Sequence, residues 1–549
     1  MNFIKLKKKL DIIAFVFLSL FFLAGLYTFK DYGVSIDEEF QRRSGFYWLN
    51  YIINFTNFFN LQNDVEQIYK TITGFTLLSP EQVPFYGIIF DVPMAFLETV
   101  FKISNPSEYF QLRHFFTFLI FFISAIFFYK LLLSRYNDKL ISLFGLLLYT
   151  LSPRIYGSSF YNNKDTLFLS LFTITIYFLF KYLDNKNLKD LFLFAFFSAL
   201  STSIRIIEIV IPIFFLLTII IFFSKNSKIT NILKISIIFI LSYFFTLIIF
   251  WPYLWESPVN NFVFFLKNAQ NYLINIKIFF NGEYINSKFI PINYIPIWIG
   301  ITSPFIHIFL FLIGFLYSFK RFLLRFLKFE LKRNYNDFWR GKSENKDFYI
   351  LTTLLLFLIF LITFNVTLYN GWRHVFFLNF YLVYFATYAF ALFMKILNKK
   401  IKKFFLIFCI ISLTMTFYKM VVFHPFQNLY FNPFLTNNMK NKFDVDYQCL
   451  SGSKFLNEIL LENLDKKKIN IGVASFCPLR RSAKMLEKNL VNKINFVGQE
   501  YDQADYIFTN NISEVNKIYN KKYNVPKDFI KYKEFTIDGV VVYEVFKKI

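Results

Sequence analysis

Long apolar blocks separated by short polar segments dominate the chain up to residue 422. A membrane-spanning helix needs about 20 mostly apolar residues, and blocks of about this length, bounded by turn residues or charges, recur along the chain. The pattern predicts eleven spans, at 11–29, 112–133, 138–153, 165–183, 190–204, 206–223, 231–250, 297–319, 348–365, 376–395 and 403–422. The fifth and sixth predicted spans are short and flank Arg205. A single long helix in their place would put every later segment on the opposite side of the membrane.

Beyond residue 422 the pattern changes to short alternating runs that are typical of a soluble domain. Two runs predict buried strands, one predicts an amphipathic helix, and one with an Asp-Gly pair predicts a hairpin. The two strand segments are 468–476 and 504–510, the helix segment is 479–490, and the hairpin segment is 535–546. The predicted fold is an all-α polytopic membrane domain of about 11 transmembrane helices over 1–422, followed by a small α/β domain over 423–549.

Composition supports a membrane protein. Of the 549 residues, 56% are hydrophobic and only 17% are charged, and the mean hydropathy is +0.44. A soluble domain normally has about a quarter charged residues. The composition therefore excludes an ordinary cytosolic enzyme and a disordered or fibrous chain. The three cysteines are too few for a disulfide scaffold, and their spacing matches no zinc site.

The distribution of positive charge orients the spans. The net charge is +24, and Lys and Arg concentrate in short segments between alternate spans, as the positive-inside rule requires. This predicts a multi-pass protein of a bacterial inner membrane, with its N-terminus inside and its C-terminal domain outside. Membrane topology thus explains the charge without a nucleic-acid partner. The predicted inner segments are 5–9, 134–139, 181–189, 224–228, 320–333 and 395–403; the outer loops are 30–111, 152–165, 251–296 and 366–375.

Ionisable residues gather where the outer loops meet the predicted spans. Taken singly, each has an ordinary explanation, since Lys and Arg snorkel to headgroups and Trp and Tyr form interfacial belts. Together they are harder to dismiss, because ionisable residues at the membrane edge indicate function by default. The five clusters are DYGVSIDEEFQRR (31–43), QLRHF (111–115), PRIYGSSFYNNKD (153–165), SIRIIE (203–208) and YNGWRH (369–374).

Carboxylates and cations at an outer membrane surface suit the transfer of a sugar from a polyprenyl-phosphate carrier. Fixed cations would stabilise the negative charge that develops on the leaving phosphate, and a carboxylate would act as general base towards the acceptor hydroxyl. No nucleotide-binding glycine loop is present, and the chain has only 16 glycines. The sequence predicts no cofactor and no metal site.

An acidic pair, Asp37-Glu38, soon after the first span resembles the C-type multi-spanning glycosyltransferases that use lipid-phosphate sugars. The closest branch includes the protein O-mannosyltransferases and the bacterial aminoarabinose transferase of lipid A. LRH before the second span is similar to bacterial members, as are five later segments in order along the chain. These are SPRIYGSSFYNNKD (152–165), FWPYLWESPVNNF (250–262), YNGWRHVFF (369–377), HPFQNLYFNPF (424–434) and DVDYQCLSGSK (444–454).

The resemblance implies roles for the clustered residues. Asp37 matches the catalytic acidic residue, and Glu38 either assists it or holds the loop by pairing with Arg42 or Arg43. Lys164 and Arg154 are candidates for the carrier phosphate, with Arg113 and Arg205 as further contacts. The remaining cavity candidates are Asp165, Asn163, His114, Arg373 and His374.

Several alternatives stay open at this stage. Lys164-Asp165 also fits an ordinary helix start, with Asp165 near the positive end of the helix dipole, and Arg373 and His374 also fit an interfacial anchor. The chain has no inserted β-trefoil-like loop, which argues against a protein acceptor and leaves lipid or polysaccharide acceptors open. The competing functions are a transporter or flippase of a lipid-linked sugar and a receptor that displays the C-terminal domain. Cys449 and Cys477 either pair or remain separate thiols.

Overall fold

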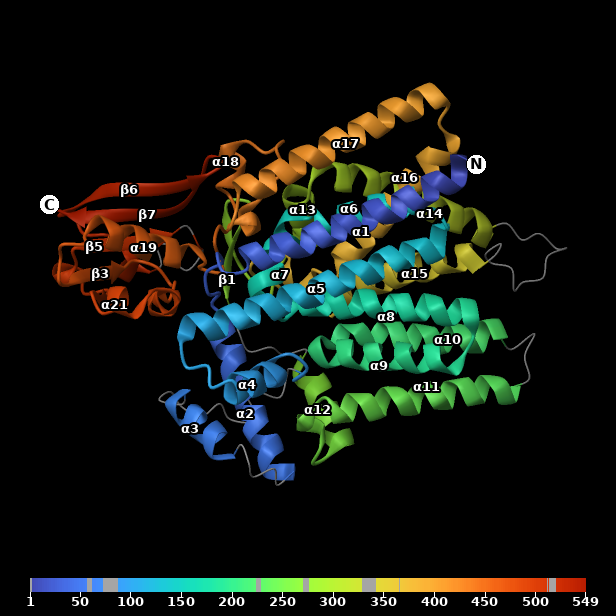
Figure 1. Ribbon diagram of the computed structural model, residues 1–549, viewed down its shortest axis with the longest axis horizontal. Coiled ribbons are helices and arrows are strands. Elements are labelled where there is room, and N and C mark those ends of the chain that lie inside the picture. Colours follow the sequence, from blue (N-terminus) through green and yellow to red (C-terminus); the bar gives the residue numbers. More distant parts are fainter. Residues whose placement is uncertain are drawn as a thin grey trace.

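The computed structural model is elongated, with helices aligned along its length and a β-sheet at one end (Figure 1). The N-terminus lies at the end of the helical bundle opposite the sheet. The structure describes residues 2–56, 62–72, 87–223, 229–269, 276–327, 342–364, 366–510, 512 and 520–549. The predicted inner segment 224–228 and part of 320–333 lie outside these residues.

A helix occupies each of the eleven predicted spans. These helices are α1 (Asn2–Thr28), α5 (Pro106–Tyr136), α6 (Lys139–Thr150), α8 (Asp165–Asn185), α9 (Leu188–Ile204), α10 (Val210–Phe223), α11 (Ile229–Ile249), α14 (Phe305–Leu327), α15 (Lys342–Thr363), α16 (Leu378–Ile396) and α17 (Lys399–Val422). Within the described residues, eight are long and apolar enough to cross a membrane, or nine if one bent pair counts as a span. α9 and α10 are shorter, at 17 and 14 residues. The chain is a multi-pass membrane protein.

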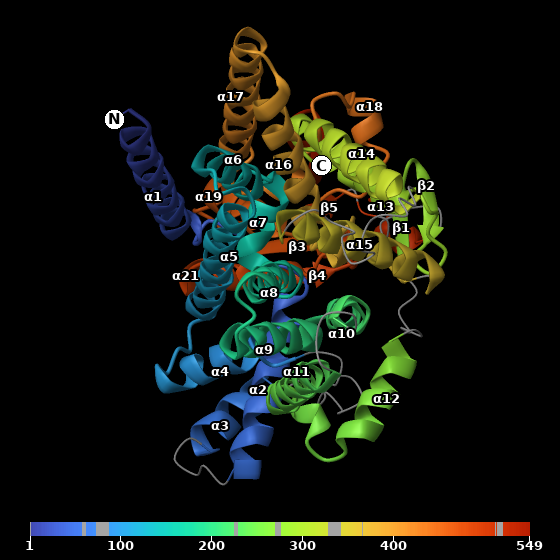
Figure 2. The same ribbon diagram turned by 90° about the vertical axis from the view of Figure 1, so that its right-hand side faces the viewer.

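Burial differs strongly among these helices. In the view along the bundle, α8 lies near the centre while α1 and α17 lie at the periphery (Figure 2). Accordingly, 89% of the apolar window of α8 is buried, against 17% for α1 and 22% for α17. The start of α8 carries the predicted Lys164-Asp165 pair, so this part of the candidate site is built on the best-packed helix.

The bent pair is α6 followed by α7 (Pro153–Tyr161), at an angle of 62°. Proline lacks a backbone N–H, so it is favoured at the first position of a helix and ends the hydrogen bonding of the helix before it. Pro153 occupies the first turn of α7. The break leads the chain through Asn162 and Asn163 to the start of α8.

The first predicted outer loop forms three further helices, α2 (Glu38–Thr56), α3 (Gln62–Ile72) and α4 (Asp91–Val100). Glu38 and Glu39 stand in the first turn of α2, where carboxylates interact favourably with the helix dipole. Gly45 of α2 faces Asp91 of α4 so closely that an added Cβ would lie 2.3 Å from the Asp91 carbonyl oxygen. This close approach brings the polar side chains of α2 and α4 together.

The C-terminal sheet contains five strands in the order β4-β3-β5-β7-β6. β3 pairs in parallel with β4 and β5, and β7 pairs antiparallel with β5 and β6. The bounds are β3 Ile469–Val473, β4 Ile494–Gly498, β5 Tyr506–Asn510, β6 Phe529–Ile537 and β7 Val540–Lys548. Asp538 and Gly539 form the predicted turn with φ of 50° and 76°. The predicted strands, the hairpin and the two-part fold class are confirmed.

The predicted helix over 479–490 is wrong in its extent. The segment forms α20 (Leu479–Ser482), a 3₁₀ turn (Ala483–Met485) and α21 (Lys488–Val491). The backbone is extended at Leu486, with φ −88° and ψ 159°, and this conformation ends the helical turns. Arg481 and Lys484 in those turns bond to the first loop, so tertiary contacts override the amphipathic pattern.

Residues 423–449 connect α17 to α19 (Ser451–Glu462) and pack against other parts of the chain. Asn432 N donates to the Ile301 carbonyl of α13 (Tyr294–Thr302) at 2.7 Å. A small hairpin of β1 (Lys277–Phe280) and β2 (Glu283–Asn286) follows α12 (Pro258–Ala269). Asp444 N donates to the Phe279 carbonyl of this hairpin. A disulfide between Cys449 and Cys477 then ties this connection to the sheet domain.

Candidate active site

Asp37 and Arg373 form an ion pair that joins two predicted clusters. Asp37 directly precedes α2, and Arg373 begins a 3₁₀ turn (Arg373–Val375) before α16. The Arg373 side chain is only 6% exposed, whereas that of Asp37 is 39% exposed. Burial acts to lower the pKa of Arg373, but the charges of Asp37, Tyr369 and Asp165 raise it above its ordinary value. Arg373 therefore stays positively charged, and Asp37 keeps access to solvent.

The start of α8 places a second group of charges beside this pair. Asp165 forms an ion pair with Arg205, which lies between α9 and α10. The Asn162 side chain fixes the turn, because its Oδ1 accepts from Asp165 N at 2.9 Å and its Nδ2 donates to Asp165 Oδ2 at 3.0 Å. Lys164 immediately precedes the helix and is half-buried.

The two groups form one electrostatic cluster. Burial lowers the pKa of Lys164 well below its ordinary value, and Arg205 lowers it further, while Asp165 and Asp37 act in the opposite direction. His374 lies in the same field. Burial, Arg373 and Arg205 lower its pKa well below the ordinary value, so its imidazole is neutral, and its ring meets that of Tyr369 edge-on at 4.4 Å. The structure thus gathers these residues from four separate segments.

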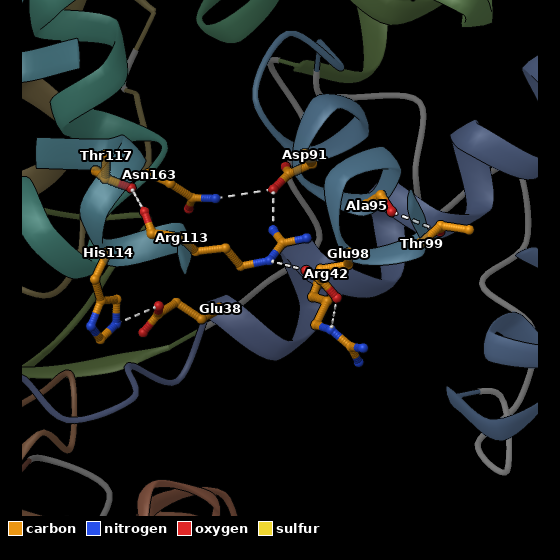
Figure 3. Close-up of polar contacts among 10 residues, drawn as sticks. All are labelled: Glu38, Arg42, Asp91, Ala95, Glu98, Thr99, Arg113, His114, Thr117 and Asn163. Carbon is orange, nitrogen blue, oxygen red and sulfur yellow. Dashed lines mark hydrogen bonds and ion pairs between the residues drawn. The ribbon is translucent and has the colours of Figure 1, made fainter. Parts of the chain in front are cut away.

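A second network lies between α2, α4 and α5 (Figure 3). Glu98 is fully buried, and its carboxylate accepts from Arg42 Nε at 2.7 Å and from Arg113 Nε at 2.9 Å. Arg113 Nη1 also donates to Asp91 Oδ1 at 3.1 Å, and Asn163 Nδ2 donates to the same oxygen at 3.0 Å. Asn163 therefore connects this network to Lys164.

Asp91 and Glu98 were not among the residues predicted from the sequence. FDVPMAFLETV reads as one apolar segment with scattered acids, and no local motif marks its carboxylates. A usable signal was their placement seven residues apart, which puts both on one face of a helix. Burial raises the pKa of Asp91 to about 6, even though Arg113 and Asn163 act to lower it.

Glu38 and His114 form a separate buried contact. His114 Nε2 lies 2.9 Å from Glu38 Oε1, and Ser35 N donates to Glu38 Oε2 at 2.6 Å. The suggested pairing of Glu38 with Arg42 or Arg43 is absent from the described contacts, because Arg42 pairs with Glu98 and Arg43 with Glu39. Glu38 caps the loop that carries Asp37.

Arg154 contacts a different set of residues. Its Nε donates to the Tyr430 carbonyl at 3.1 Å, and its guanidinium lies 5.2 Å from the Trp298 ring and 5.0 Å from the Phe431 ring. Stacking on aromatic faces stabilises a buried guanidinium. These contacts hold α7 against the connection that leads to the C-terminal domain.

The C-terminal domain contacts the loop on both sides of Asp37. Arg481 Nη1 donates to the Ile36 carbonyl at 2.7 Å, and Lys484 Nζ donates to Glu39 Oε2 at 2.6 Å. Ile36 N also donates to the Gln448 carbonyl at 3.3 Å, next to the disulfide-bonded Cys449. The conformation around Asp37 therefore depends on residues more than 400 positions further along the chain.

Residues 92–255 match the family described as dolichyl-phosphate-mannose-protein mannosyltransferase. The matched segment contains Arg113, His114, Arg154, Arg205 and the Asn163–Asp165 turn. A search of the curated proteins finds no match. The family match confirms the resemblance to C-type glycosyltransferases and indicates a membrane glycosyltransferase related to mannosyltransferases.

Proposed function

We propose that this protein transfers a sugar from a polyprenyl-phosphate donor to an acceptor hydroxyl at the outer face of a bacterial cytoplasmic membrane. The observation that carries the proposal is the cluster of Asp37 with Lys164, Arg205 and Arg373 at one end of the bundle. It puts a solvent-accessible carboxylate next to several cations.

In the proposed reaction Asp37 is the general base. The acceptor oxygen attacks the anomeric carbon and gives its proton to the Asp37 carboxylate, while the bond between that carbon and the phosphate oxygen breaks. The donor phosphodiester, with one negative charge, leaves as a phosphate monoester with two. Lys164 and Arg205 stabilise the added charge. Arg373 holds the Asp37 carboxylate in place through their ion pair.

The remaining predicted residues then have positioning roles. Asp165 orients Arg205, Asn163 links Lys164 to Asp91, and neutral His374 lines the same region. Glu38 with His114 shapes the loop. Arg113 positions Asp91 through their ion pair, and Arg154 positions the connection between α17 and α19 by donating to the Tyr430 carbonyl.

Two observations support the proposed orientation. The predicted inner segments carry the excess of Lys and Arg. The Cys449–Cys477 disulfide suits an oxidising compartment on the other side of the membrane. Cysteine labelling from outside intact cells tests the orientation directly, because a residue at position 37 and one at position 164 must both be reachable from that side.

The function is tested by comparing cells that express the wild-type protein, Asp37→Asn or Asp31→Asn. Mass spectrometry of surface glycolipids, polysaccharides and proteins identifies a sugar modification that depends on the gene. Asp37→Asn should remove it at equal membrane abundance. Asp31 is a matched control because it lies in the same loop and pairs with His424 at 2.8 Å. Full modification with Asp37→Asn would exclude Asp37 as the base, and transport without bond cleavage in vesicles would favour a flippase.

A further inference from the structure

The helix α12 follows the spanning helix α11 at the end of the bundle that carries the candidate active site. A 3₁₀ turn (Pro252–Leu254) joins the two helices, and Tyr253 in this turn packs with Trp48 of α2. α12 contains only 12 residues, whereas a membrane-spanning helix needs about 20. In the view along the bundle, α11 is seen end-on and α12 from its side (Figure 2). The helix α12 therefore runs across the bundle axis, at the level at which α11 leaves the membrane.

One face of α12 is both apolar and exposed. Val259, Val263 and Leu266 are 74%, 43% and 37% exposed. They follow one another at intervals of four and three residues, which puts their side chains on the same face of a helix. On another face, the Phe265 side chain is 5% exposed and packs edge-on against the Trp251 ring at 4.8 Å. The helix thus buries one apolar face in the protein and presents a second one to its surroundings.

This exposed face continues a surface that contacts lipid. In α11 only 28% of the apolar window is buried. Leu241, Phe245 and Ile249 in its second half are 65%, 66% and 42% exposed. In a spanning helix, exposed apolar side chains of this kind face the acyl chains. Because the α12 face begins at Val259, shortly beyond Ile249, lipid is the occupant that makes the apolar surface continuous.

Aromatic side chains around α12 are typical of a membrane–water interface. Trp255 donates from its indole Nε1 to the Ile248 carbonyl at 2.8 Å, and its ring lies 5.0 Å from that of Phe55 in α2. Phe55 is 63% exposed, and Tyr51 of the same helix donates to Glu256 at 3.2 Å. Trp and Tyr are enriched at this level because they combine an apolar ring with a polar group. The same contacts tie α2 to the turn before α12.

We propose that α12 is an interfacial helix, and that its face of Val259, Val263 and Leu266 inserts into the lipid leaflet on the side of the candidate active site. A helix of this kind lies in the plane of the interface, with its apolar face roughly 5–10 Å into the boundary between headgroups and acyl chains. Lys267 in its last turn is exposed and extends to the headgroup phosphates. Through the contacts with α2, the helix sets the depth of the segment that begins with Asp37. The insertion does not depend on which reaction the site catalyses.

Depth measurements on the full chain in nanodiscs of phosphatidylcholine and phosphatidylglycerol test this insertion. In a Cys409→Ser background, Val263→Cys carries a fluorophore. Leu241→Cys in α11 and Lys488→Cys in α21 provide a deep and an aqueous reference. The label at position 263 should be quenched most by lipids with a nitroxide near the headgroup, and it should lose the quenching by aqueous iodide that the label at position 488 shows. The label at position 241 should be quenched most by nitroxides deep in the acyl chains.

The alternatives give different results, and each would overturn the inference. Iodide quenching at position 263 equal to that at position 488 would place the face in water. Protection from iodide and from every lipid nitroxide would mean that protein covers it, either a second copy or another part of the chain. A depth equal to that of position 241 would place α12 in the hydrocarbon core.

A charge in the apolar face provides a second test. With the label at position 259, Val263→Asp should raise iodide quenching and reduce quenching by the shallow nitroxide, because a carboxylate favours water over the acyl-chain boundary. Asn260→Asp is the matched control, since it introduces the same charge at an exposed polar position of the same helix. It should leave the depth of the label unchanged. An equal depth in the two variants would also overturn the inference.

Discussion

Arg373 donates a hydrogen bond from Nη1 to a carboxylate oxygen of Asp37, 336 residues away in the sequence. The pair joins the first loop to the turn before α16, so the proposed base is held by a different part of the chain from the one that carries it. A buried guanidinium keeps its charge and has a fixed fork of donors, which makes it suited to orienting a carboxylate.

This pairing predicts non-additive effects on catalysis. Asp37→Asn should lower kcat by about 10²- to 10⁴-fold, the usual contribution of a general base. Arg373→Gln should also lower kcat, because it releases the Asp37 carboxylate, and the double variant should be little worse than Asp37→Asn alone. Steady-state kinetics of all four proteins test this. Losses that multiply in the double variant would mean that Arg373 acts independently of Asp37.

The low pKa of Lys164 predicts that donor binding weakens as pH rises. Burial and Arg205 move the pKa of this ammonium well below its ordinary value, so the charge that the phosphate needs is lost at a lower pH than in a free lysine. Above that pKa, the dissociation constant should rise by about tenfold per pH unit, and binding should take up a proton.

Lys164→Arg is the matched control for this pH effect, because arginine stays protonated at every accessible pH. Its donor affinity should vary less between pH 6 and 9 than that of the wild-type protein. Calorimetry in buffers of different ionisation enthalpy measures the proton uptake. The same pH profile in both proteins would exclude Lys164 as the titrating group.

Glu98 predicts a stability effect. Its fully buried carboxylate lies between Arg42 and Arg113, whose side chains are 8% and 2% exposed. Glu98→Gln keeps the shape but leaves two buried cations with less compensation, and breaking such a buried pair costs about 3–5 kcal/mol. The unfolding temperature in detergent should fall clearly below that of the control Glu108→Gln, which alters an exposed side chain in the first turn of α5. Equal temperatures would refute this role.

The fold was largely predictable because its signals are local. A span is recognised from its own 20 residues, and the Asp-Gly turn at 538–539 and the break at Pro153 are each specified by the residues present there. The segment 479–490 shows the limit. Its apolar spacing favours one helix, but Arg481 and Lys484 bond to the first loop, and the sequence gives no sign of that contact.

The candidate site was predictable only as a set of residue types at one membrane surface. The ion pairs of Asp37 with Arg373 and of Asp165 with Arg205 join segments that are distant in the sequence, and no periodicity indicates such partners. For the same reason the sequence does not mark Glu98 and Asp91 as site residues, since their role depends on α4 packing against α2 and α5.

The disulfide predicts a further stability effect. Cys449 and Cys477 are 28 residues apart, and closing a loop of this length stabilises a fold by roughly 3–4 kcal/mol in the chain-entropy model. Replacing both with serine should lower the unfolding temperature of the C-terminal domain. Cys409→Ser is the control, because Cys409 is a free, buried cysteine in α17. No difference between the two variants would show that the disulfide contributes little.

The contact between the C-terminal domain and the first loop predicts that Lys484 supports catalysis from a distance. Burial raises the pKa of Glu39, but Lys484, Arg43 and Arg42 together lower it more, so the net pKa is below the ordinary value and the pair with Lys484 is intact at neutral pH. Lys484→Met should lower kcat severalfold with little change in donor affinity, because the loop that carries Asp37 loses a tether and the phosphate site does not.

Hydrogen exchange separates this role of Lys484 from a general loss of stability. In Lys484→Met, the backbone amides of residues 31–39 should exchange faster while those of the buried helix α8 stay protected. Lys488→Met, which removes an exposed lysine from α21 of the same domain, should match the wild-type protein in both kcat and exchange. If Lys484→Met behaves like Lys488→Met, the C-terminal domain does not position Asp37 through this ion pair.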